Sequence, residues 1–135
     1  MNQILHRLWV GDMEDAQRAT APVTQIFTLR EEATIPDDPT VGHMHVPIPD
    51  ETALDPAVWQ GMVHALSMLL GRGDTILVHC RLGKSRSPAL CAAYLTACGY
   101  DLAEAVAWVE QARPEVAIHP LTWQGVEAWW QWRQG

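Results

Sequence analysis

A short apolar strand that runs directly into a loop and then into a helix limits the fold more than any other part of this sequence. The strand is expected over residues 75–79, TILVH, and the next residue is Cys80. An apolar, β-branched run bounded by turn signals is typical of a central strand that is covered on both faces. After the loop, Pro88 begins a predicted helix that continues through Ala97 and ends at Gly99. This succession of strand, loop and helix predicts an α/β fold.

The remaining predicted elements alternate between strand and helix. The other strands are short apolar runs, at residues 7–10, 24–30 and 43–48. The other helices are indicated by capping residues and helical spacing, and they begin near Asp12, at Asp55 with Pro56 in the first turn, at Asp101 with Glu104, and at Leu121. The helix from Pro56 ends at Gly71 and Gly73, and the last helix ends at Arg133. We therefore predict a central, mostly parallel sheet that is flanked by helices.

The composition is that of a folded domain with an acidic surface. Of the 135 residues, 48% are hydrophobic and 19% are charged, so we expect a single domain over residues 1–135 with a substantial core. The net charge of −7 argues against general affinity for nucleic acid or for anionic membrane surfaces. The first residues lack an apolar run with a cleavage site, and no stretch approaches ~20 consecutive apolar residues, so neither secretion nor stable membrane insertion is expected.

The cysteines and histidines indicate neither a disulfide framework nor a metal centre. Cys80, Cys91 and Cys98 are odd in number and lack framework spacing, which favours a reduced compartment, and we expect a cytoplasmic location. Cys91 and Cys98 bound the apolar helical segment CAAYLTAC and are expected to pack into the core. His43 and His45 alternate on one strand face, which is more often simple surface than a metal site. No metal or cofactor is expected, and the sequence does not indicate the oligomeric state.

The loop HCRLGKSRS at residues 79–87 shares features with two unrelated kinds of loop. Its GKS resembles the end of a nucleotide-binding P-loop, but the glycine that opens such a loop is replaced here by Val78. A rhodanese-type loop also carries a Cys, but it reaches its Arg with one residue fewer. The spacing from Cys80 to Arg86 therefore favours a loop that binds phosphate beside a nucleophilic thiolate, with a sulfurtransferase as the alternative enzyme class.

The residue types of this loop suit phosphate chemistry. Successive backbone N–H groups, above the N-terminus of the following helix, can bind a dianion and stabilise the Cys80 thiolate. Arg86 can hold two phosphoryl oxygens at once. Gly83 permits a tight backbone, and Ser87 is positioned to donate a hydrogen bond to the sulfur when it must leave. His79 is expected to orient the loop by hydrogen bonding.

With these residues in place, the chain resembles the cysteine-dependent protein tyrosine phosphatase superfamily, and within it the dual-specificity branch. The signature HC-x-x-G-x-x-R-[ST] is complete, and the resemblance continues through LWVGDMEDA, SPALCAAYL and RPEVAIHP, departing at Trp9, where Tyr is common, and at His119, where Asn is common. It implies a protein tyrosine phosphatase-like fold and hydrolysis of phosphomonoesters through a phosphocysteine intermediate. It gives catalytic roles to Cys80, Arg86 and Ser87. Substrate binding falls to the other residues of the loop, His79, Arg81, Leu82, Gly83, Lys84 and Ser85.

A proton donor for the leaving group must come from elsewhere in the chain. In the resembling family it is an Asp on a loop about thirty residues before the Cys, and VPIPDETALDP supplies Asp50 and Asp55. Asp50 lies thirty positions before Cys80 and follows a strand that ends in prolines, whereas Asp55 is expected to cap a helix. We predict that Asp50 is the general acid and then the general base, with Asp55 as the alternative.

The sequence leaves the substrate open. A compact domain implies a shallow pocket, which favours phosphotyrosine together with phosphoserine or phosphothreonine in proteins, or a small phosphomonoester. Basic residues at Arg81 and Lys84 resemble the pattern of family members that act on lipid or inositol phosphates, although Arg is common at the first of these positions. A catalytically inactive phosphate-binding module is the alternative outside enzymes.

Five of the seven tryptophans follow residue 107, in WVEQA and WQGVEAWWQW. We expect them to pack the terminal helices into the core, with an interaction face as the alternative. Their position in an acidic chain disfavours docking on a lipid surface.

Overall fold

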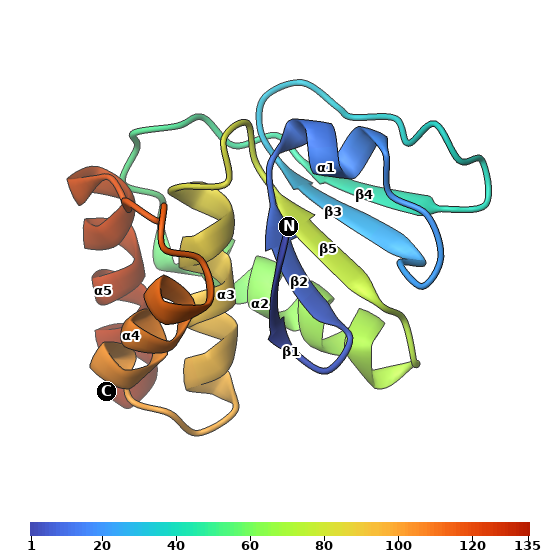
Figure 1. The fold of residues 1–135 in the computed structure, drawn as a ribbon. Coiled ribbons are helices and arrows are strands. Elements are labelled where there is room, and N and C mark those ends of the chain that lie inside the picture. Colours follow the sequence, from blue (N-terminus) through green and yellow to red (C-terminus); the bar gives the residue numbers. More distant parts are fainter.

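The computed structural model describes residues 1–135 and has one five-stranded sheet with the strand order β1-β2-β5-β3-β4 (Figure 1). The strands are β1 (Asn2–Leu5), β2 (Leu8–Gly11), β3 (Gln25–Leu29), β4 (Gly42–Val46) and β5 (Ile76–His79). Strands β2, β5, β3 and β4 pair in parallel, and only β1 is antiparallel to its neighbour. The predicted α/β fold with a mostly parallel central sheet is therefore confirmed.

Helices cover both faces of this sheet. The helices are α1 (Met13–Gln17), α2 (Pro56–Gly71), α3 (Arg86–Ala97), α4 (Leu102–Ala112) and α5 (Pro120–Gln134). Figure 1 shows α3, α4 and α5 gathered on one side of the sheet and the short α1 on the other. Helix α2 belongs to the same side as α3 and α5, because its apolar residues share one buried cluster with theirs. None of these helices is both long and apolar enough to span a bilayer.

Strand β5 is buried on both faces, as its run of apolar residues predicts. Ile76 and Val78 join the larger buried cluster with α2 and α3, whereas Leu77 points to the smaller cluster under α1. All three side chains are fully buried. Strand β5 lies in the middle of the sheet, and its carboxyl end leads into Cys80. The loop that follows lies between α1, whose Met13 N–H binds the Arg81 carbonyl, and α3.

One strand was not predicted and several boundaries differ from the sequence prediction, although β2 to β5 each begin and end within two residues of their predicted limits. Strand β1 was not predicted, because its four residues lack a hydrophobic period of their own; it pairs with β2 through a tight turn in which Arg7 has a φ of 66°. Helix α3 begins at Arg86 rather than at Pro88, since proline is tolerated anywhere in a first turn where N–H groups have no helical acceptor. Helix α5 begins at Pro120 rather than Leu121. The predicted capping box of Asp101 and Glu104 is confirmed.

Candidate active site

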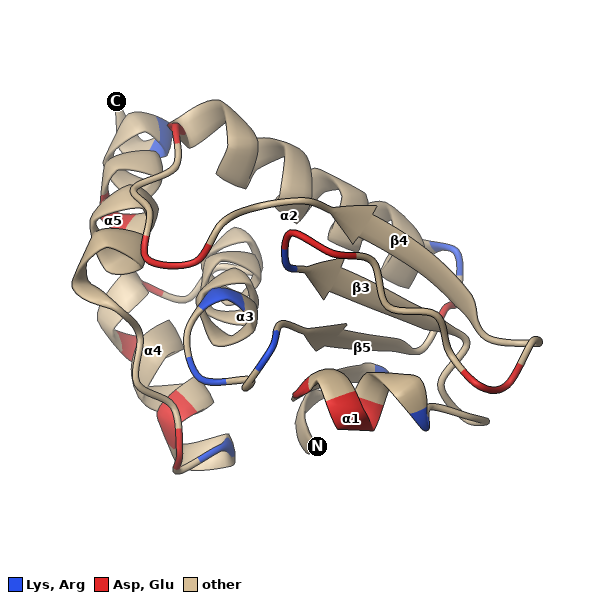
Figure 2. Ribbon diagram, turned by 90° about the horizontal axis from the view of Figure 1, so that it is seen from above, with Lys and Arg blue, Asp and Glu red and all other residues tan.

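The loop after β5 brings Cys80 against the first turn of α3. The Cys80 side chain is buried, with 3% of its residue surface exposed, and its Sγ lies 3.2 Å from the Ser87 Oγ. In Figure 2 the basic residues of this loop and of the start of α3 form a blue arc at the carboxyl end of β5. The acidic segment that follows β4, and the mixed segment that follows β3, approach the same end of the sheet. The sulfur therefore lies where three connecting segments meet.

The carbonyl groups of the loop are all bound by the surrounding scaffold. Each carbonyl from Cys80 to Ser85 lies 2.8 to 3.4 Å from a nitrogen donor. The pairs are Cys80 with His79 Nδ1, Arg81 with Met13 N, Leu82 and Gly83 with Arg113, Lys84 with Ala117 N, and Ser85 with Ala89 N. The backbone N–H groups of residues 81–85 have no backbone acceptor. A run of unpaired N–H groups above a helix N-terminus is the arrangement that binds an oxyanion.

Gly83 is at the tightest point of the loop. Its φ is 69°, and an added Cβ would lie 2.6 Å from the Gly11 carbonyl oxygen and 2.7 Å from the Arg113 Nη2. A side chain here would meet backbone atoms of β2 that cannot move aside. Glycine is therefore required both by the backbone conformation and by the space.

Arg113, at the end of α4, supports the loop from outside, and sequence reasoning missed this role. The guanidinium is buried and donates to the Gly83 carbonyl at 2.8 Å and to the Asn2 Oδ1 at 2.7 Å. Glu115 lies 3.2 Å from its Nη1 and balances its charge. Arg113 begins the segment RPEVAIHP, which the family resemblance includes, but nothing in the local pattern connects Arg113 to Gly83.

Arg86 presents one unpaired edge of its guanidinium to the site. The residue is 6% exposed, and its Nη1 donates to the Ile48 carbonyl at 3.0 Å. Its Nε is buried without a hydrogen-bond partner. Buried N–H groups of a charged side chain are almost always satisfied, so an acceptor from a ligand is expected at this edge.

Asp50 lies beside Arg86, and Asp55 does not. The Asp50 Oδ1 is 3.6 Å from the Arg86 Nε and accepts a hydrogen bond from the Glu51 N–H at 2.9 Å. Asp55 is at the N-cap of α2, as predicted, but its side chain makes no capping hydrogen bond, which corrects the expectation that capping occupies this carboxylate. The N–H of Val58, at the position that a capping carboxylate binds, donates instead to the Asp55 backbone carbonyl at 3.0 Å.

His79 orients the loop in its neutral form. Its Nδ1 lies 3.1 Å from the Cys80 carbonyl and its Nε2 lies 2.7 Å from the Thr28 Oγ1. Because a carbonyl only accepts, the proton is on Nδ1 and the Thr28 hydroxyl donates to Nε2. Burial lowers the pKa of His79 to about 4, although its hydrogen bond to the Cys80 carbonyl acts in the opposite direction.

The site opens into a hollow of about 250 Å³ that is lined entirely by charged residues. Three of them are arginines and three are acids, namely Arg30, Arg81, Arg86, Glu31, Glu32 and Asp50. Arg30 was not among the predicted site residues, and its guanidinium donates to the Glu32 carboxylate at 3.1 Å. Lys84 is exposed but is not among the lining residues.

The other predicted loop residues lie at the rim or behind the loop. Leu82 is 61% exposed. The Ser85 hydroxyl faces away from the N–H groups, because it accepts a hydrogen bond from the His119 N–H at 3.0 Å. Among the predicted binding residues, Ser85 therefore supports the loop through its side chain.

The two remaining cysteines differ from each other. Cys91 is buried in α3, as predicted, and burial raises the pKa of its thiol, with a smaller contribution from Cys80. Cys98 is exposed, which corrects the prediction that it packs into the core: it is the C-cap of α3, and residues 97–100 are all exposed. All three cysteines are free thiols. The His, Cys, Asp and Glu side chains form no group of three that could hold a metal ion, and His45 contacts the Arg30 carbonyl instead.

Comparison with known proteins identifies close relatives. The family model described as "Dual specificity phosphatase, catalytic domain" matches residues 9–128. Human dual specificity phosphatase 28 is 33% identical over 115 residues. These residues are 84% of this chain and 65% of the human protein, so the chain spans slightly less than two thirds of the human protein's length. The crystal structure of that human protein superposes with a TM-score of 0.89 at 27% identity and covers 99% of this chain and 98% of the other. A mouse putative dual specificity phosphatase, in complex with zinc tungstate, gives a TM-score of 0.88 at 26% identity over 98% of this chain and 87% of the other.

Proposed function

Because this chain belongs to the dual-specificity phosphatase family, we propose that it hydrolyses phosphate monoesters of tyrosine and of serine or threonine in proteins. One observation carries this proposal. The backbone N–H groups of residues 81–85, in the loop that carries Cys80, have no backbone acceptor, and the buried Nε of Arg86 has no hydrogen-bond partner. A phosphoryl group has the charge and the number of oxygens to satisfy them.

In the first step, the Cys80 thiolate attacks phosphorus and an S–P bond forms as the ester P–O bond breaks. The leaving oxygen takes its electron pair from that bond and a proton from Asp50. Arg86 and the loop amides hold the three equatorial oxygens while their charge redistributes. The products of this step are the free alcohol or phenol and a phosphocysteine.

In the second step, water attacks the same phosphorus and the S–P bond breaks. Asp50, now ionised, takes a proton from the attacking water. Ser87 donates its hydroxyl hydrogen bond to the departing thiolate, an assignment supported by the 3.2 Å separation of its Oγ from the sulfur. Inorganic phosphate leaves and the protein returns to its starting state.

The charges of the opening favour a protein substrate over a polyphosphate. Arg30 and Arg81 line the hollow together with Glu31, Glu32 and Asp50, so the positive charge available for a second phosphate is offset by carboxylates. Lys84, the residue that suggested a lipid or inositol phosphate, is outside the hollow. We therefore rank a lipid or inositol phosphate, an inactive phosphate-binding module and a sulfurtransferase below a protein phosphatase.

The proposal is tested first by hydrolysis of p-nitrophenyl phosphate with a chelator present. Cys80→Ser should abolish turnover. Asp50→Asn should reduce hydrolysis of a phosphotyrosyl peptide, whose phenolate is a poorer leaving group than p-nitrophenolate, by roughly 10²- to 10⁴-fold. Asp55→Asn is the matched control and should leave turnover within about twofold, because Asp55 does not line the hollow. Activity that persists in Cys80→Ser excludes the mechanism.

A second measurement separates the competing functions. Tungstate is a tetrahedral oxyanion, and the mouse relative forms a complex that contains it. Competitive inhibition by tungstate is expected of a phosphatase, and tungstate binding without turnover supports the inactive module instead. Faster turnover of phosphatidylinositol phosphates than of phosphotyrosyl peptides contradicts the protein substrate, and thiocyanate formation from thiosulfate and cyanide contradicts phosphatase chemistry.

A further inference from the structure

A groove between α4 and α5 lies apart from the catalytic hollow. Its larger part has a volume of about 440 Å³ and is lined by Leu102, Trp123, Glu127 and Trp130 among others. A second hollow of about 240 Å³ shares Trp123 with it and continues along α4 past Val106. We call these two hollows together the α4–α5 groove. No residue of the groove lines the hollow beside Cys80.

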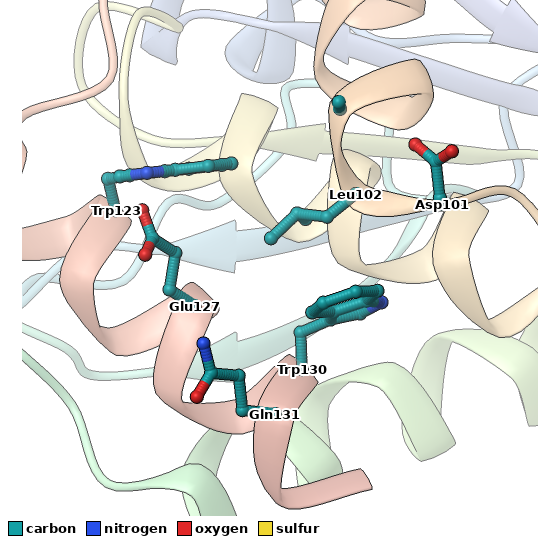
Figure 3. Close-up of a pocket in the computed structure, with 7 residues that line it drawn as sticks. Asp101, Leu102, Trp123, Glu127, Trp130 and Gln131 are labelled. Carbon is teal, nitrogen blue, oxygen red and sulfur yellow. The ribbon is translucent and has the colours of Figure 1, made fainter. Parts of the chain in front are cut away.

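The floor and ends of the groove are apolar and aromatic. In Figure 3 Glu127 lies between Trp123 and Trp130 along α5, and Leu102 and Asp101 face them from the start of α4. Both tryptophans are half-buried, so part of each residue remains accessible to solvent. The sequence predicted core packing for the C-terminal tryptophans, with an interaction face as the alternative. Trp123 and Trp130 are partly exposed and line an open groove, so core packing is not their whole role.

The charged side chains of the groove are all acidic. They are Asp101, Glu110 and Glu127, and none of these forms an ion pair with a lysine or arginine. The Glu104 N–H donates to the Asp101 carboxylate at 2.8 Å, and this hydrogen bond lowers the pKa of Asp101. Three carboxylates without cationic partners around an aromatic groove make it complementary to a cation.

We propose that the α4–α5 groove binds a basic segment of a partner protein, with an arginine or lysine side chain between the Trp123 and Trp130 rings. The cation would pair with Glu127, and an apolar neighbour in the segment would cover Leu102 and Val106. Aromatic faces attract a guanidinium, and an adjacent carboxylate adds a charge-assisted hydrogen bond.

The charge of the groove argues against other occupants. Its carboxylates repel an anionic membrane surface, on which an amphipathic face normally relies for attraction. A second copy of this chain carries the same net charge of −7 and would meet the groove with like charge. A basic segment alone gains from both the apolar walls and the acidic rim.

The test uses the whole chain and a fluorescein-labelled peptide of alternating arginine and leucine, with binding measured by anisotropy. A second peptide with citrulline in place of arginine has nearly the same shape without the charge. Glu127→Lys should weaken binding of the arginine peptide by at least about tenfold, the loss expected for an ion pair beside an aromatic face. Asp37→Lys changes net charge equally at an exposed site outside the groove and should change affinity by less than about twofold.

Three outcomes overturn the proposal. Equal weakening by Glu127→Lys and Asp37→Lys shows only general attraction between charges. Equal affinity for the citrulline peptide removes the role of the cation. A change of oligomeric state in Glu127→Lys, measured by sedimentation, identifies a second copy as the occupant.

A spectroscopic readout locates the peptide even if a variant is unstable. In the unsubstituted protein, the indole N–H signals of Trp123 and Trp130 should shift when the arginine peptide is added, and that of the fully buried Trp59 should not. Shifts confined to residues of the catalytic loop instead would refute binding at the groove. Turnover of p-nitrophenyl phosphate by Glu127→Lys should be unchanged, so loss of docking is distinguishable from loss of the proposed enzymatic activity.

Discussion

The catalytic loop and the segment that carries Asp50 meet at Arg86, but they are held in different ways. Every carbonyl from Cys80 to Ser85 is bound by a nitrogen donor, and several of the donors come from distant parts of the chain. The Asp50 carboxylate and carbonyl accept hydrogen bonds from the adjacent Glu51 and Thr52. The loop that we propose binds the oxyanion is thus held by long-range contacts, and the segment of the proposed proton donor is held by local ones. Damage to the first should weaken oxyanion binding, and damage to the second should affect turnover alone.

Gly83→Ala should disrupt the loop from Cys80 to Ser85 more than any other single substitution considered. The new Cβ would overlap the Gly11 carbonyl oxygen at a φ of 69°, so we expect a loss of about 3 kcal/mol or more in the free energy of unfolding. We also expect at least a roughly hundredfold fall in kcat/KM, because the loop amides move. Gly73→Ala is the control, since Gly73 also has a positive φ but has open space around it. Turnover by Gly83→Ala within tenfold of the unsubstituted protein would contradict the required backbone conformation.

Because His79 is neutral in the folded protein, the free energy of unfolding should depend on pH in the acid range. Its pKa is about 4 in the folded protein and 6.5 in the unfolded chain, so between these values only the unfolded state takes up the proton. Above pH 6.5 the neutral His79 does not reduce the free energy of unfolding. As the pH drops from 6.5 to 4, protonation of the unfolded state lowers this free energy by about 3 kcal/mol. The measurement is the free energy of unfolding in urea at several pH values for the unsubstituted protein and for His79→Gln.

The difference between these two proteins isolates His79 from the carboxylates that titrate in both. His79→Gln should flatten the dependence between pH 6.5 and 4, and His43→Gln, at an exposed histidine, should leave it unchanged. Parallel curves for the His79→Gln and unsubstituted proteins would show that His79 is not held neutral.

Arg113→Lys tests the support of the loop from outside. Lysine keeps the charge but cannot reach Asn2 and the Gly83 carbonyl together, so the free energy of unfolding should fall by about 2 kcal/mol. Tungstate affinity, measured by calorimetry, should fall by about tenfold if the loop amides lose their alignment. Arg72→Lys, at an exposed arginine, is the control. Lost stability with unchanged tungstate affinity would limit Arg113 to a structural role.

Glu51→Gly tests the segment that carries Asp50, and it should have the smallest effect on stability and turnover. Glu51 has a φ of 53°, which glycine adopts without strain, so the free energy of unfolding should rise by less than about 1 kcal/mol. Turnover should change by less than about threefold, because Asp50 keeps its backbone contacts. Glu51→Ala, which removes the carboxylate but keeps the Cβ, separates charge from conformation. A large loss of turnover in Glu51→Gly but not in Glu51→Ala would show that Asp50 also needs a rigid backbone to act as the general acid.

The sequence predicted the parts of the site that are contiguous. The loop from His79 to Ser87 is a single run between a strand and a helix, so its spacing and its residue types could be interpreted together. Asp50 required a resemblance, because thirty residues separate it from Cys80 and only its approach to Arg86 connects them. Local pattern was sufficient where neighbours in the chain are neighbours in the structure.

Residues that act through distant contacts were not predictable in this way. Arg113 reaches carbonyl groups thirty residues earlier, and a carbonyl acceptor leaves no mark on the sequence. Arg30 joins the site only because β3 ends beside β5 in the sheet. Cys98 has the same helical phase as Cys91, seven residues earlier, but periodicity does not show which end of a helix is exposed. These errors all concern tertiary contacts rather than the type of secondary structure.

The burial of β5 and α3 has a consequence for how the molecule opens. Strand β5 is buried on both faces, and ten of the residues of α3, from Arg86 to Thr96, are buried as well. Segments with such dense packing exchange their amide hydrogens only when the whole molecule unfolds, whereas loops and termini open on their own. The loop that holds Cys80 is therefore joined at both ends to the slowest-exchanging part of the chain. Fraying of the termini leaves β5 and α3 in place, so the loop loses its two attachments only when the whole molecule unfolds.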